Sequence, residues 1–140
     1  MIFIPGNVPS MKNSRIYSAG KGSFYSKACQ HYLRDMGIKH FSSSKREVIG
    51  YKTRQNLFRE AVGNYFDGCI FPLQLGIHFV RHTRRRFDFI NMCQILLDLL
   101  VAHRCLPDDS MDYVWPYVLE IDGRGYSVDR TKPGVYLERG

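Results

Sequence analysis

Three carboxylates flank the most apolar segment of the chain. Asp88 precedes residues 89–101, and Asp108 and Asp109 follow Pro107 a few residues beyond that segment. Hydrolysis of a phosphodiester with Mg²⁺ uses hard oxygen ligands, usually one or two carboxylates with water and phosphate oxygens. The three aspartates are therefore candidate metal ligands and catalytic residues, for Mg²⁺ or for Mn²⁺ as its substitute. A solvated turn after the proline is the alternative interpretation of the Asp108-Asp109 pair.

Basic side chains gather in two segments of the chain. One group stands directly before Asp88, and the other lies in the polar stretch from Gly6 to Ser26. Arginine and lysine bind phosphate oxygens, although a run of arginines in a connector is often only solvated. The candidate DNA-binding residues are Lys12, Arg15, Lys21, Arg81, Arg84, Arg85 and Arg86.

The charge of the chain is unevenly distributed. Its net charge is +7, from 20 basic and 13 acidic side chains. Residues 1–86 hold 15 of the basic side chains and only 4 of the acidic ones, whereas residues 87–140 hold 5 and 9. This distribution suits a polyanion that is held by one part of the protein and processed by another. A soluble protein with uneven surface charge explains the composition equally well.

The segment between the aspartates has the pattern of a buried helix. Its polar side chains Asn91, Gln94 and Asp98 stand at positions i, i+3 and i+7, on one narrow stripe of a helix over about 89–102. The other positions as far as Val101 are apolar, which is typical of an element inside the core. A buried helix with carboxylates beyond both ends and arginines beside it indicates a functional site.

The remaining pattern predicts a mixture of strands and helices. The segment from about 6 to 25 is expected to form a mobile basic loop. With 140 residues and no internal repeat, the chain should form one domain of the α/β or α+β class around a small mixed sheet. Strands are expected at residues 1–5, 73–80, 113–121, 127–129 and 134–138, and further helices at 26–36 and 45–66.

The composition also indicates the cellular compartment in which the protein is expected. No run of about 18 apolar residues occurs, and the N-terminus lacks the pattern of a signal peptide. The four cysteines are widely spaced and fit neither a zinc motif nor a dense disulfide framework. We therefore expect a cytoplasmic protein with reduced thiols and no membrane partner.

Three segments resemble the core signature of the RusA-type Holliday-junction resolvases. That family carries arginines before an Asp-x-Asp-Asn motif, a helix with an internal aspartate and a later Asp-Asp pair. The matching segments are 84–91 (Arg-Arg-Arg-Phe-Asp-Phe-Ile-Asn), 97–100 and 107–110, and Val8-Pro9-Ser10, Asn13 and Tyr17 are similar to the family's opening loop.

The resemblance implies a homodimeric, Mg²⁺-dependent endonuclease of phage or prophage type. Its substrates would be Holliday junctions or other branched double-stranded DNA, in recombination, repair or the clearing of branches before packaging. Asp88 matches the first motif aspartate, Asn91 the motif asparagine, and Asp108 and Asp109 the later pair. Residues 37–70 are longer than is usual in the family and are expected to be an insertion.

Two positions depart from the family pattern. Ile90 stands where a second motif aspartate is expected, and Gln94 stands in place of a lysine. Isoleucine cannot bind a metal, and glutamine cannot supply positive charge to a leaving oxygen. Either the site is rebuilt, with Asp98 or Lys12 taking over, or the protein is a catalytically impaired DNA-junction binding protein of the same fold.

The length of the predicted helix limits how the aspartates can meet. A helix of about 13 residues is roughly 20 Å long, and the return over residues 104–107 spans at most about 14 Å. A site within one chain therefore requires a shorter helix. Alternatively, a twofold dimer could place Asp88 of one copy near Asp108 of the other.

Overall fold

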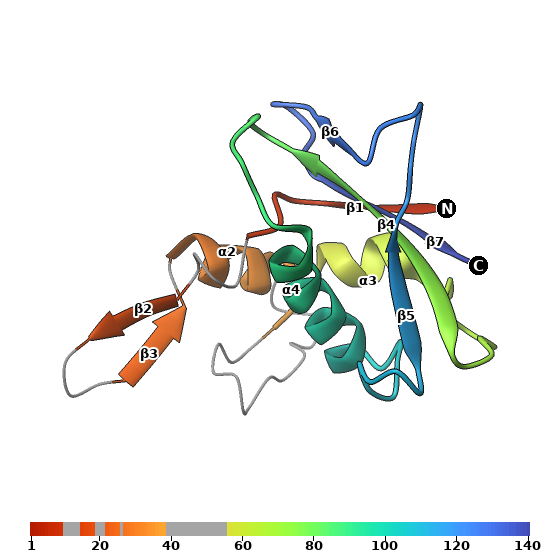
Figure 1. The fold of residues 1–140 in the computed structure, drawn as a ribbon. Coiled ribbons are helices and arrows are strands. Elements are labelled where there is room, and N and C mark those ends of the chain that lie inside the picture. The colour runs from red at the N-terminus through yellow and green to blue at the C-terminus, as the bar shows by residue number, and fades with distance from the viewer. Residues whose placement is uncertain (10–14, 19–21, 26, 39–55) are drawn as a thin grey trace.

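The computed structural model describes residues 1–9, 15–18, 22–25, 27–38 and 56–140 (Figure 1). These residues form a small α+β fold with a five-stranded mixed sheet, a separate two-stranded hairpin and three helices, which confirms the predicted class. The elements in chain order are β1 (Ile2–Pro5), β2 (Arg15–Ser18), β3 (Gly22–Tyr25), α2 (Lys27–Asp35), α3 (Leu57–Val62), β4 (Leu73–Arg81), α4 (Phe89–Ala102), β5 (Val114–Val118), β6 (Tyr126–Val128) and β7 (Gly134–Arg139).

Strand β4 is the centre of the main sheet. The strand order is β1-β7-β4-β5, and β6 also pairs with β4. Strand β7 runs antiparallel to β4 along one edge, while β5 and then β6 run parallel to it along the other. Helix α4 connects β4 to β5, as a parallel pair requires a crossover. The end of β4 is therefore followed directly by the connector 82–88 and the start of α4.

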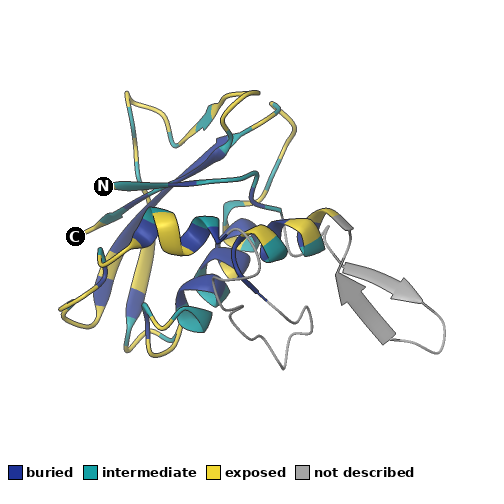
Figure 2. Ribbon diagram, turned by 180° about the vertical axis from the view of Figure 1, so that it is seen from behind, coloured by how far each residue is buried: buried dark blue, intermediate teal, exposed yellow. Residues whose placement is uncertain are grey.

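The core lies between one face of the sheet and the helices. Alternate β4 residues Leu73, Leu75, Ile77 and Phe79 are buried there, as the period of two predicts. Each such side chain contributes about 1.5–3 kcal/mol when it is fully buried. In Figure 2 the middle of the sheet is dark blue and the connectors around it are largely yellow. Helix α4 adds the buried side chains Met92, Cys93, Ile95, Leu96, Leu99 and Leu100.

Helix α4 contributes to the core as predicted, but the polar stripe leaves one of its sides facing outward. Gln94 is exposed, and Asn91 and Asp98 are half-buried, so the polar stripe forms the outward side of the helix. Ile90 is 76% exposed. The helix therefore covers one face of the sheet and leaves its first turn accessible near Asp88.

Two predicted segments differ from the structure. The stretch predicted as loop over about 6–25 contains the hairpin β2–β3, in which Arg15 pairs with Tyr25. The continuous helix predicted over 45–66 is also wrong, because Asn56 has non-helical backbone angles and caps α3 by accepting a hydrogen bond from the Arg59 N–H. That helix ends at Val62, and residues 45–55 lie outside the described ranges.

His78 stands where the edge of β4 changes its partner from β5 to β6. It is fully buried, with Nδ1 2.8 Å from the Leu119 carbonyl oxygen and Nε2 2.7 Å from the Ser127 hydroxyl oxygen. The imidazole thereby joins the segment that leaves β5 to the segment that enters β6. This interior position makes His78 a structural residue and leaves it out of contact with any phosphate at the surface.

None of the four cysteines forms a disulfide. Among the described helices, none is long and apolar enough to cross a membrane.

His103 joins the C-terminal ends of α2 and α4. Its Nε2–H donates to the Met36 carbonyl oxygen at 2.7 Å, and its ring stacks on Phe58 with 4.3 Å between the centroids. Burial lowers the pKa of His103, the hydrogen bond to Met36 acts in the opposite direction, and Arg59 lowers the pKa further.

We expect the protein to lose stability in mild acid through His103. Because the pKa of His103 is lowered in the folded state, the unfolded state binds more protons below its own pKa of about 6.5. The free energy of unfolding should therefore fall as the pH drops through that value and level off below the folded-state pKa. Denaturant unfolding at about pH 7 and pH 5 measures the loss. His103→Gln does not titrate, so an equally large loss in this variant would contradict the assignment.

Candidate nucleic-acid interface

The connector 82–88 is anchored to the sheet through Phe87. The Phe87 ring lies edge-on to Tyr126 of β6 with 4.9 Å between the centroids, and edge-on to Phe79 of β4 at 6.4 Å. The Arg81 guanidinium carbon lies 4.6 Å from the centroid of the same ring. These contacts fix the connector at the end of the sheet where β4 and β6 finish.

Arg84, Arg85 and Arg86 are exposed on this anchored connector. Their guanidinium groups stand in solvent at one end of the sheet, where bidentate contacts to phosphate oxygens are sterically open. Arg81 is placed differently. It is partly buried, its Nη1 lies 3.3 Å from the Met92 sulfur, and burial lowers its pKa against a smaller opposing effect of Tyr126.

Asp88 is the N-cap of α4. Its Oδ1 accepts hydrogen bonds from the Ile90 N–H at 3.0 Å and, more weakly, from the Asn91 N–H at 3.4 Å. The carboxylate is exposed, and both bonds use the same oxygen, so Oδ2 keeps its capacity for a further ligand. Burial, and secondarily the nearby Asp88, raise the pKa of the Cys93 thiol to about 12, which leaves that thiol protonated. Asp88 can therefore serve both as a cap and as one metal ligand.

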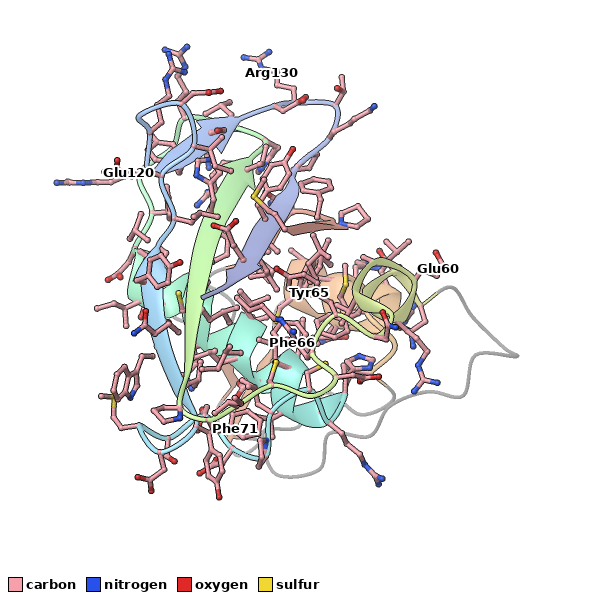
Figure 3. All side chains as sticks on the ribbon, turned by 90° about the vertical axis from the view of Figure 1, so that its right-hand side faces the viewer. Glu60, Tyr65, Phe66, Phe71, Glu120 and Arg130 are labelled. Atoms are coloured by element: carbon pink, nitrogen blue, oxygen red, sulfur yellow. The ribbon has the colours of Figure 1, made fainter. Side chains whose placement is uncertain are left out.

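The turn 129–133 reaches the same end of the sheet. The Asp129 N–H donates to the Arg81 carbonyl oxygen at 2.8 Å, which places the start of the turn beside the start of the connector. Arg130 and Lys132 are exposed on this turn, and Figure 3 shows Arg130 pointing away from the molecule. Sequence reasoning missed both residues, because their distance along the chain from Asp88 gives no sign that β6 ends beside β4.

Asp108 and Asp109 lie at the opposite end of the molecule. The Tyr113 carbonyl oxygen accepts from the Leu73 N–H at 2.9 Å, so the acidic turn adjoins the start of β4, whereas Asp88 follows its end. The 14 residues of α4 separate the two ends by about 21 Å. The structure therefore does not bring Asp88 together with Asp108 and Asp109 in one chain.

The other predicted ligand and DNA-binding residues are placed as follows. Asn91 is half-buried in the first turn of α4, close to Asp88. Lys12 and Lys21 lie outside the described residues, and Arg15 is described only through its backbone in β2. Within the described ranges, no group of three or more His, Cys, Asp or Glu side chains is arranged to hold a metal ion.

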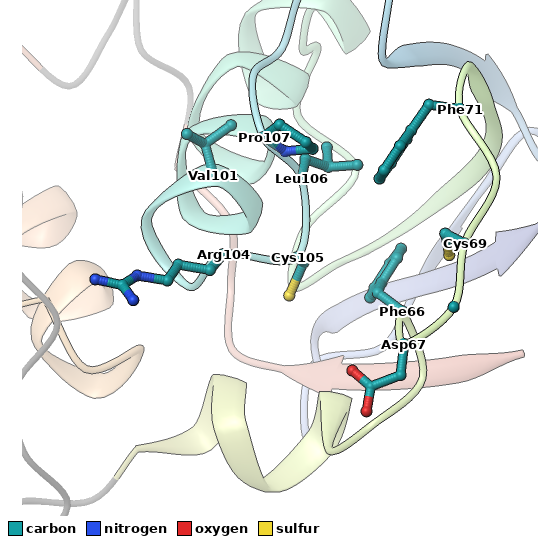
Figure 4. Close-up of a pocket in the computed structure, with 10 residues that line it drawn as sticks. Phe66, Asp67, Cys69, Phe71, Val101, Arg104, Cys105, Leu106 and Pro107 are labelled. Carbon is teal, nitrogen blue, oxygen red and sulfur yellow. The ribbon is translucent and has the colours of Figure 1, made fainter.

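A pocket of about 420 Å³ lies near the C-terminal end of α4, next to Pro107 (Figure 4). Its polar lining is limited to Asp67, Cys69, Arg104 and Cys105, among apolar side chains. Burial, and then the nearby Asp67 and Cys69, raise the pKa of Cys105 to about 11, so its thiol is protonated and a poor metal ligand. The pocket therefore adds no metal site to the predicted Asp108-Asp109 pair.

Searches against protein-family models, curated proteins and solved structures found no significant match to this chain.

Proposed function

We propose that the protein is a homodimer that binds branched double-stranded DNA through the connector 82–88, at the end of the sheet where β4 finishes. It cleaves the bound DNA with Mg²⁺. The exposed Asp88 carboxylate stands two residues after three exposed arginines on an anchored connector, and this arrangement carries the proposal. Arginines that hold the DNA backbone would orient a phosphodiester next to a metal ion bound at Asp88. The resemblance to the RusA-type resolvases supports the same reaction.

The distance between the aspartates indicates that two copies of the protein contribute to one site. One Asp88 supplies a single carboxylate, and Asp108 and Asp109 of the same chain are about a helix length away. Two α4 helices arranged antiparallel about a twofold axis would place Asp88 of one copy near the acidic turn of the other. We therefore propose a site shared between two copies, which also suits the twofold symmetry of a four-way junction.

A junction-binding protein without cleavage is the second candidate. The exposure of Ile90 favours it, because an accessible apolar side chain stands next to Asp88 where the resolvase pattern has a metal-binding aspartate. Gln94 is also exposed and carries no positive charge. Both candidates share the DNA surface and differ only in catalysis.

Cleavage of a labelled synthetic four-way junction tests the proposal. Purified protein is incubated with the junction in Mg²⁺, in Mn²⁺ and in EDTA, beside the Asp88→Asn variant. We expect paired, metal-dependent nicks that the variant lacks. Asparagine is as good an N-cap as aspartate, so this substitution removes the negative charge of the metal ligand while it preserves the start of α4.

The alternatives predict distinct results in the same assay. Binding without nicks in either metal would reject the nuclease and support the binding protein. Nicks that persist in Asp88→Asn would point to a contaminating nuclease or to a site elsewhere. Affinity for the junction no greater than for an unrelated polyanion would reject both candidates.

A further inference from the structure

The turn 129–133 is held in place at both of its ends. At its start, the Asp129 N–H donates to the Arg81 carbonyl oxygen at 2.8 Å. At its end, the Pro133 carbonyl oxygen accepts from the Gly6 N–H at 2.9 Å. The turn joins β6 to β7 on the two sides of β4, and these hydrogen bonds fix it to the end of β4 and to the end of β1.

The Asp129 side chain fixes the interior of the turn. Its Oδ1 accepts from the Thr131 N–H at 2.9 Å, from the Thr131 hydroxyl at 2.9 Å and from the Lys132 N–H at 3.1 Å. These hydrogen bonds lower the pKa of Asp129, with a smaller contribution from the charge of Lys132, so the carboxylate is ionised at neutral pH. The backbone of Arg130 is thereby enclosed between two fixed points.

This turn and the connector 82–88 lie at the same end of the sheet, and both expose basic side chains. Phe87 packs on Tyr126 of β6, and β6 leads directly into the turn. Arg130 and Lys132 are exposed on the turn, next to the segment that exposes the three arginines 84–86. The two basic segments lie about 40 residues apart in the chain and meet only because β6 pairs with β4.

We propose that the turn 129–133 is a second segment that binds the DNA backbone, with Arg130 and Lys132 contacting phosphates and Asp129 acting as their positioning residue. The inference rests on the proposed DNA binding and adds a second contact region to it. A turn that is already fixed loses little conformational entropy when it binds, so its two cations contribute more of their interaction energy to affinity.

The negative charge of Asp129 makes the inference testable. A carboxylate inside a phosphate-binding surface repels the phosphates. The presence of Asp129 there is explained if the hydrogen bonds that it accepts, which hold the turn in shape, increase the affinity more than its charge lowers it. Asp129→Asn removes the charge and keeps the acceptor oxygen, whereas Asp129→Ala removes both. Long-range electrostatics alone affects the two variants equally, so any difference between them measures the positioning of the turn.

The first experiment measures the affinity of a fluorescent four-way junction by anisotropy in EDTA over a range of salt concentrations. Arg130→Ala/Lys132→Ala should bind about tenfold more weakly or worse, and the slope of log K against log salt should fall by about 1.8. Arg59→Ala/Arg104→Gly removes the same charge near the opposite end of α4 and serves as the matched control. Equal effects of the two double variants would overturn the inference.

The second experiment compares the two Asp129 variants under the same conditions. Asp129→Asn should bind at least as tightly as the wild type, and Asp129→Ala should bind about fivefold more weakly than Asp129→Asn. Equal affinities would show that Asp129 acts through its charge alone and would overturn its positioning role. Thermal melts of both variants confirm that they are folded.

The results also separate this inference from the proposed function. A wild-type protein that binds junctions, and depends on Arg84, Arg85 and Arg86 but not on Arg130 and Lys132, would overturn only the second contact region. A wild-type protein that does not bind the junction would overturn both proposals together.

Discussion

Replacement of Arg84, Arg85 and Arg86 together by alanine is expected to lower the affinity for a four-way junction by more than 100-fold. The estimate takes about 1 kcal/mol for each charged contact to phosphate, which is at the cautious end for charge-assisted hydrogen bonds. The slope of log K against log salt should fall by about 2.7, because three fewer counterions are released on binding. Titration of labelled DNA at several salt concentrations gives both quantities.

Two controls distinguish phosphate binding from a loss of structure. The three side chains are exposed, so the alanine variant should unfold within about 0.5 kcal/mol of the wild type. The variant Arg84→Lys/Arg85→Lys/Arg86→Lys keeps the charge but loses the bidentate geometry of the guanidinium group. It should keep the salt slope and lose part of the affinity. A triple alanine variant that binds as the wild type does would remove the connector from the DNA surface.

The parts of the fold that sequence reasoning predicted well are those with strong periodicity. Alternation over residues 73–80 predicted β4, and the apolar run after Asp88 predicted α4 with the bounds that the structure shows. The polar stripe predicted in this run faces outward and is not enclosed in the core. A helix that covers one face of a sheet keeps one side that faces away from the core. Here the three polar positions form that side, together with the partly buried side chains of Phe89 and Leu97.

The hairpin β2–β3 and the break before α3 depend on weaker signals. The stretch predicted as loop is rich in Gly, Ser and Asn, which favour turns, yet Arg15–Ser18 and Gly22–Tyr25 are long enough to pair with each other. The apolar residues on both sides of Asn56 have helical spacing, so the sequence predicted one helix through this position. In the structure the Asn56 side chain caps α3, and the helix begins after it. In both places a local hydrogen bond pattern outweighed the average composition.

The candidate site shows the same limit. The sequence placed Asp88 beside the arginines correctly, because these residues are adjacent in the chain. It could not place Arg130 and Lys132 there, because their position follows from the pairing of β6 with β4. It also could not tell whether Asp88 and Asp109 meet in one chain, since that depended on where α4 ends. The observed 14-residue helix excludes the shorter helix that a site within one chain required.

A mixture of Asp88→Asn and Asp109→Asn subunits is expected to regain cleavage that each variant lacks alone. In a site shared between two copies, each mixed dimer has one site with both substitutions and one site with neither. Random exchange makes about half of the dimers mixed, so total cleavage should recover to about a quarter of the wild-type level. The mixed dimers should also nick the junction once rather than in symmetric pairs, because only one of their two sites is intact.

The pattern of the products is the decisive part of this measurement. Subunits are exchanged by mild denaturation and refolding before the labelled junction is added with Mg²⁺, and nicked and fully resolved products are separated on a gel. Recovery of single nicks supports a shared site. A site built within each chain predicts no recovery in any mixture, because each subunit then carries its own defect. That result, from variants that each refold and bind the junction, would reject the two-copy arrangement and leave the DNA surface around Asp88 as a binding surface.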